Sequence, residues 1–168
     1  ALDPVERFAR LPAIAPASIR VDPPSVDGDI TRFSVGSLEG RPVYRISTAA
    51  IVRFVFADTG DVVPPVDRDQ ALRIAHRFTG VGEVRYDAYL TDSDQWTFDV
   101  RRQMPVHRIS VDDAQRTRLY VSERGGEVVA KTTASGRRWA WMGAVIHWIY
   151  FAPFRRQAAA WSNTIIGL

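Results

Sequence analysis

The sequence predicts an α+β protein made of two similar units in tandem, each an antiparallel β-meander with a helix packed on one face. An internal repeat is the main reason. Residues 42–47, Pro-Val-Tyr-Arg-Ile-Ser, reappear at 105–110 as Pro-Val-His-Arg-Ile-Ser. Residues 53–63 reappear as 118–129, with one extra residue in the second turn and two more before it. Two ordered blocks that recur together indicate two similar subdomains.

The first unit is predicted to span residues 1–65. Asp3 is an N-cap candidate and Pro4 suits the first helical position, so a short helix is expected over 3–10 before a proline-rich irregular stretch. Alternating apolar and polar residues, or β-branched and aromatic ones, then predict three strands, at 30–35, 43–46 and 52–57. Gly60 is expected to supply the positive φ of the turn that follows.

The second unit is predicted to span residues 66–134. Apolar residues at helical spacing predict a helix over 67–79, which Gly80 ends. Strands are predicted at 84–90, 96–100, 106–111 and 119–121, and a Gly-Gly turn leads to a last strand at 128–129.

The composition limits the chemistry. The 168 residues contain no cysteine, which excludes disulfides, thiolate zinc sites and cysteine nucleophiles. The net charge of +3 argues against a nucleic-acid partner, and Arg101 and Arg102 are interpreted as a solvated strand face. The acidic pairs at 92–94 and 112–113 are interpreted as turns, so no metal site is predicted.

Each of the three histidines has an ordinary structural interpretation. His107 stands where the first copy has Tyr44, which favours a residue on a strand face, and His76 flanks the helical stripe and is expected to face solvent. His147 lies in an apolar stretch, where a histidine can be a hydrogen-bonded packing residue or an axial haem ligand. The packing interpretation is favoured for His147.

The third segment, residues 135–168, is predicted to be an amphipathic, aromatic-rich juxtamembrane helix followed by the truncated start of a membrane span. Aromatic and arginine side chains favour the lipid headgroup level. An alternative is that residues 137–156 form an ordinary helix packed on the second sheet. The residues assigned to the membrane interface are Arg137, Arg138, Trp139, Trp141, Trp148, Tyr150, Phe151, Phe154, Arg155, Arg156 and Trp161.

These features together resemble the PepSY domain family. The resemblance rests on a helix with an Ala/Ile stripe, a strand with a central Trp, the residues 105–110, an Arg-Leu-Tyr-Val strand, and a Gly-Glu-Val-Val turn. Residues 58–63, Asp-Thr-Gly-Asp-Val-Val, resemble the Asp-x-x-Thr-Gly-Glu-Val ending of that family. Residues 138–155 resemble the juxtamembrane stretch of PepSY-associated transmembrane proteins.

The resemblance implies a bacterial protein whose PepSY units lie on the extracytoplasmic, periplasmic side of the cytoplasmic membrane. It implies a non-catalytic module that binds or regulates a peptide, a protease or a neighbouring membrane protein. Some membrane relatives carry haem and reduce iron or siderophores, so one alternative is the periplasmic part of a haem reductase, with haem elsewhere in a longer protein or at His147. A structural spacer between membrane helices is the other alternative.

Overall fold

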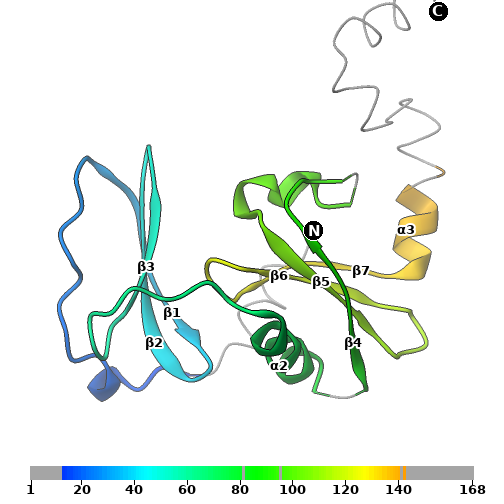
Figure 1. Ribbon diagram of the computed structural model, residues 1–168, viewed down its shortest axis with the longest axis horizontal. Helices are drawn as coiled ribbons and strands as arrows, with labels where there is room; N and C mark the ends of the chain where they lie inside the picture. Colours follow the sequence, from blue (N-terminus) through cyan, green and yellow to red (C-terminus); the bar gives the residue numbers. More distant parts are fainter. Residues whose placement is uncertain (1–12, 81, 95, 141, 143–168) are drawn as a thin grey trace, which may run out of the picture.

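The computed structural model describes residues 13–80, 82–94, 96–140 and 142, and over these the chain is an α+β protein with two antiparallel sheets. A short 3-10 helix, η1 (Pro16–Ser18), precedes a sheet formed by β1 (Ile30–Leu38), β2 (Arg41–Thr48) and β3 (Val52–Phe56), in the order β1-β2-β3. Figure 1 shows this sheet set apart from the second one, with α2 lying beside the second.

The second sheet follows α2 (Arg68–Thr79) and has the order β4-β5-β6-β7. Its strands are β4 (Val84–Leu90), β5 (Val106–Val111), β6 (Arg118–Ser122) and β7 (Val128–Thr132). A 3-10 helix, η2 (Phe98–Gln103), connects β4 to β5, and α3 (Ala134–Ala140) follows β7. Both sheets are meanders, as the sequence predicts.

The helix α2 forms where the local signals place it. The Asp67 side chain accepts a hydrogen bond from the backbone N–H of Gln70 at 2.7 Å, which caps the first turn. Gly80 ends the helix in the left-handed conformation, with φ of 68°. Ala71 and Ala75 are fully buried, so the predicted apolar stripe is confirmed as the face that packs on the sheet.

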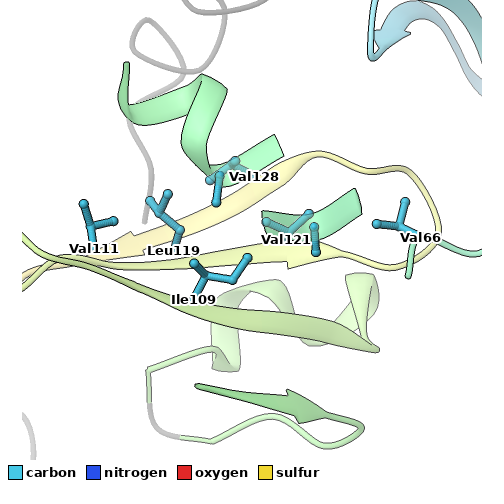
Figure 2. Packing of buried hydrophobic residues seen from close by; sticks show 8 residues of the cluster. Val66, Ile109, Val111, Leu119, Val121 and Val128 are labelled. Carbon is cyan, nitrogen blue, oxygen red and sulfur yellow. The ribbon is translucent and has the colours of Figure 1, made fainter. Parts of the chain in front are cut away.

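The larger core lies between α2 and the second sheet. Figure 2 shows its strand residues gathered on one face of the sheet, with Val66 near the turn between β6 and β7. Burying such aliphatic side chains contributes roughly 1.5–3 kcal/mol each relative to exposure. The cluster consists of Val66, Ala71, Ala75, Ile109, Val111, Leu119, Val121 and Val128.

The strand predicted over 96–100 is wrong. The Asp94 side chain accepts hydrogen bonds from the backbone N–H groups of Trp96 and Thr97 and from the Thr97 hydroxyl. These bonds give the backbone a local alternative to a sheet ladder, so a turn and η2 form instead. Arg101 and Arg102 are therefore exposed on a 3-10 helix, and their assignment to a strand face is corrected.

The expectation of one helix on each sheet is confirmed for the second sheet only. Val21 and Val66 occupy equivalent places in the two units. The backbone N–H of Val21 donates to the carbonyl of Ala57, just after β3, at 3.1 Å, and that of Val66 donates to the carbonyl of Glu123, just after β6, at 2.8 Å. After Val66 the chain forms α2, whereas after Val21 it runs through an irregular segment, residues 22–29. The predicted helix over 3–10 lies outside the described residues.

The structure also corrects the alignment of the repeat. The Pro42 carbonyl accepts from Ala57 N, and the Pro105 carbonyl accepts from Glu123 N. The turn bonds match as well, from Gly60 N to Phe56 O and from Gly126 N to Ser122 O. The two turns therefore have the same length, and all the additional residues of the second copy precede β6.

Candidate binding site at the junction of the two sheets

The two units contact each other around Gly126. A Cβ atom built on this glycine would lie 3.3 Å from side-chain atoms of both Ile74 and Val66, and it would overlap Leu38. Ile74 belongs to α2, but it also packs against the apolar cluster of the first sheet, which contains Leu38. The helix α2 therefore packs against the apolar cores of both sheets.

An ion pair joins the units at a second point. The Glu39 carboxylate, in the turn between β1 and β2, accepts from Arg73 Nε and from Gln70 Nε2, each at 3.0 Å. Both donors lie on α2. The hydrogen bond from Arg73 holds the pKa of Glu39 below its usual value, although partial burial opposes this.

The Glu39 contact gives a pH prediction. Because the folded-state pKa is lowered, its stabilisation is complete above the unfolded-state value of about 4.5 and is lost as the pH falls through the folded-state pKa. We expect Glu39→Gln to lower the free energy of unfolding at pH 7 by about 0.5–1 kcal/mol, since the pair is partly exposed. At pH 3, below the unfolded-state pKa, the difference between the variant and the wild type should be smaller than at pH 7. Urea denaturation at the two pH values measures this, and a difference that persists undiminished at pH 3 would contradict it.

A small cleft lies where the first sheet meets the turn between β6 and β7. Its volume is about 20 Å³, far below the roughly 300–1,000 Å³ of sites for drug-sized ligands. Three guanidinium groups and one carboxylate line it together with apolar and small residues, so the lining is net positive. The lining residues are Arg45, Val52, Phe54, Arg102, Gln103, Ser122, Arg124, Gly125 and Glu127.

Arg45 is the central side chain of this cleft. It comes from the middle strand β2, where it pairs with Phe54 of β3. Its guanidinium carbon lies 5.5 Å from the centre of the Phe54 ring. One terminal nitrogen lies 3.4 Å from Glu127. Its Nε is buried and makes no hydrogen bond within the described part of the chain. A buried donor without a partner costs roughly 1–3 kcal/mol, so it calls for an explanation.

The second sheet repeats this arrangement with Arg108. Arg108 pairs across the strands with Tyr120 as Arg45 does with Phe54, and its Nε is likewise buried without a hydrogen bond in the part that the structure describes. Here, however, the carboxylate of Asp87 lies 3.8 Å from Nε. Asp87 also accepts a short hydrogen bond from the Ser110 hydroxyl.

The outer edge of β1 is a further exposed feature. Within the described residues β1 pairs with β2 alone, so its other side presents unpaired backbone groups. Ile30, Phe33 and Val35 are 54%, 46% and 39% exposed. Their register partners on β2 place them on one face, the face that α2 covers in the second unit.

The buried histidine is engaged in packing. His107 Nε2 donates to the carbonyl of Val66 at 2.8 Å, and Nδ1 lies 3.0 Å from the Tyr86 hydroxyl. Its counterpart Tyr44 donates to the Val21 carbonyl at 2.7 Å, so the repeat position tethers the entering chain in both units. The strand-face interpretation of His107 is confirmed, and so is the exposure of His76.

Most of the predicted membrane-interface residues lie outside the described residues. Arg137, Arg138 and Trp139 are described, in α3, and Trp139 is 71% exposed. Arg137 donates to the carbonyls of Thr132 and Arg116, which ties α3 to the second sheet. Outside the described part lie His147 and also Trp141, Trp148, Tyr150, Phe151, Phe154, Arg155, Arg156 and Trp161.

Neither a spanning helix nor a metal cluster is found in the part of the chain that the structure describes. No helix there is long and apolar enough to cross a membrane. No group of three or more histidine, aspartate or glutamate side chains there is placed to hold a metal ion. The membrane and haem expectations therefore stay predictions.

Over the described residues, the fold and site define a two-sheet α+β protein with an unpaired edge on β1 and a basic cleft between repeated units. No protein-family model, curated protein or solved structure matches the chain. The resemblance to the PepSY family thus stays a prediction from the sequence.

The sequence did not single out Arg45, although the repeat contains the signal. An arginine stands at the same place in both copies, between an aromatic or histidine residue and an isoleucine. A charged residue kept at a position inside a strand points to a shared structural or binding role. What the sequence could not give was the cleft beside it, which depends on the packing of the two units.

Proposed function

We propose that this chain is a non-catalytic binding module of the PepSY type that takes an extended peptide segment of a partner protein onto the open edge of β1. The partner is a peptide, a protease or a neighbouring membrane protein on the extracytoplasmic side of a bacterial membrane. The support for membrane tethering is the aromatic and arginine-rich sequence of residues 137–161. The support for peptide binding is the edge of β1.

The edge of β1 suits an added strand in both its backbone and its side chains. It is nine residues long, which is longer than a typical strand. Unpaired backbone groups supply affinity in such an addition, and alternate side chains supply specificity. The residues Ile30, Phe33 and Val35 offer those alternate apolar contacts.

The second unit gives a contrast that supports the choice of β1. There Tyr86, the counterpart of Phe33, is half-buried, the guanidinium of Arg68 in α2 lies over its ring, and its hydroxyl contacts His107. In the first unit no described helix covers Phe33. On this face the β4 residue is covered by α2 in the second unit, whereas the β1 residues Phe33 and Val35 are exposed in the first, which is the difference expected of a binding surface.

The test is a peptide screen on the full chain. Random nonapeptides displayed on phage are selected on the protein, and the affinity of the best peptide is measured by fluorescence anisotropy. We expect Phe33→Lys to weaken binding by roughly tenfold or more, because a charge on the edge strand opposes strand addition. The matched control is Ile51→Lys, since Ile51 has a similar exposure of 44% but lies in the β2–β3 turn.

Two outcomes would overturn the proposal. The first is that the screen enriches no peptide above the background set by an all-proline peptide, which cannot add as a strand. The second is that the two lysine variants bind the selected peptide equally well. Both residues are exposed, so each substitution should change the free energy of unfolding by no more than about 0.5 kcal/mol, and thermal melts followed by circular dichroism check this.

A further inference from the structure

The cleft at Arg45 has a built-in counterpart in the second unit, and the comparison indicates its ligand. In the second unit Arg108 faces the Asp87 carboxylate, which also contacts Arg85 at 3.7 Å and Arg118 at 4.0 Å. Asp87 therefore sits among three arginines. The three ion-pair distances are longer than hydrogen bonds, so the arginines stabilise the Asp87 charge through their positive field.

A register irregularity explains why the first unit lacks this carboxylate. In the second sheet Tyr86 pairs with Ile109 and Ala88 with Arg108, so Asp87 is an extra residue of β4. In the first sheet Phe33 pairs with Ile46 and Ser34 with Arg45, with no residue between. A bulge adds one residue and redirects a side chain. Without it, β1 supplies no carboxylate to Arg45.

The surroundings of Arg45 favour an incoming anion. Arg102 and Arg124 add two exposed guanidinium groups to the cleft, against the single carboxylate of Glu127. Glu127 reaches a terminal nitrogen of Arg45 and leaves Nε without a hydrogen bond among the described residues. The volume of about 20 Å³ suits a group of a few atoms.

We propose that the cleft at Arg45 binds a carboxylate of the partner peptide, an acidic side chain or a C-terminal carboxylate, at the place beside the arginine that the Asp87 carboxylate takes in the second unit. Arg45 Nε donates to one carboxylate oxygen, and Arg102 and Arg124 attract the charge. Val52 and Phe54 pack against the adjoining apolar part of the ligand. This inference rests on the proposed function and adds to it a preference for acidic peptides.

The experiment uses two probes of known composition, a hexapeptide of glutamate and its glutamine analogue, both with amidated C-termini. Binding to the full chain is followed by the side-chain Nε–H signals of arginine in ¹H–¹⁵N spectra. We expect the glutamate peptide to shift the Arg45 signal saturably and to leave that of Arg108 in place, because Asp87 already occupies the site beside it. The same two peptides with free C-termini then distinguish an acidic side chain from a C-terminal carboxylate. Binding of the glutamine peptide only when its C-terminus is free would identify the C-terminal carboxylate as the ligand.

Arg45→Met is the decisive variant, and Arg53→Met is its matched control. Arg53→Met removes the same charge from β3. Arg53 is adjacent to Phe54, but its side chain lies on the face of the sheet opposite to Arg45. We expect Arg45→Met to weaken binding of the glutamate peptide roughly tenfold, and Arg53→Met to change it less than about twofold. Glu127→Gln should tighten binding, since it removes the competing carboxylate, and it keeps the test informative if Arg45→Met fails to fold.

The outcomes separate this inference from the proposed function. Equal losses in Arg45→Met and Arg53→Met, or no saturable shift at Arg45, would overturn the carboxylate site. If the nonapeptide selected on β1 still binds and is weakened only by Phe33→Lys, the strand-binding function stands without it. A selected peptide rich in acidic residues whose affinity drops in Arg45→Met supports both.

Discussion

Alanine in place of Gly126 is expected to lower the free energy of unfolding by about 2–5 kcal/mol, from backbone strain and overpacking together. Gly126 has φ of 61°, in the left-handed region that side chains disfavour. The new Cβ would also overlap the terminal methyl group of Leu38, which is only 3% exposed, so this side chain would have to shift within the core. The measurement is urea denaturation followed by circular dichroism.

The structurally equivalent glycine of the first unit provides the control. Gly60 closes the matching turn with φ of 85°, but a Cβ there would meet Val21 at an ordinary 3.5 Å. Gly60→Ala should therefore show the backbone strain alone, about 1–2 kcal/mol. If both variants lose the same stability, the close contact at Gly126 contributes nothing, and the packing of the two units around that turn is not as described.

Local signals in the sequence predicted the elements that local interactions determine. The cap at Asp67, the apolar stripe and the stop at Gly80 all act within one helix, so α2 was predicted nearly to the residue. The positive φ of Gly60 is likewise a property of its own turn. Where a side chain competes with the backbone, as Asp94 does, an apolar and aromatic stretch was mistaken for a strand.

The repeat was visible in the sequence, but its register was not. Sequence similarity aligned Arg53 with Arg118, whereas hydrogen bonds align Arg53 with Leu119, because Ile46 pairs with Arg53 and Ile109 with Leu119. The strands β3 and β6 are both largely apolar, so shifting their alignment by one residue still matches residues of similar type. The alternation of faces fixes the register only once the buried face is known.

The same limit explains the candidate site. The paired arginines Arg45 and Arg108 could be found from the repeat, since they keep their place in both copies. The difference between the two arginines could not be predicted, because it depends on one extra residue, Asp87, in β4. The sequence of β4 shows no repeat with that of β1. The exposure of Phe33 on β1 could not be predicted either, because it depends on an irregular segment, residues 22–29, standing where α2 stands in the second unit.

Truncation of the central isoleucine of the second sheet is expected to have the other large effect. Ile109 is fully buried between the sheet and α2, within the larger core cluster. We expect Ile109→Ala to lower the free energy of unfolding by about 3–5 kcal/mol, from lost burial and the cavity that remains. Chemical denaturation of the full chain measures it.

Ile46 is the equivalent residue of the first sheet, and it tests how the two units unfold. It is also buried, at 1% exposure, but its cluster contains only Tyr44 and Ala57, with Val26 packed against it. Ile46→Ala should therefore cost less, about 2–3 kcal/mol. Because Gly126 and Ile74 join the apolar cores of both units, each variant should move a single cooperative transition. A second transition that moves only with Ile46→Ala would show instead that the first sheet unfolds by itself, and that the cleft at Arg45 is lost before the second core.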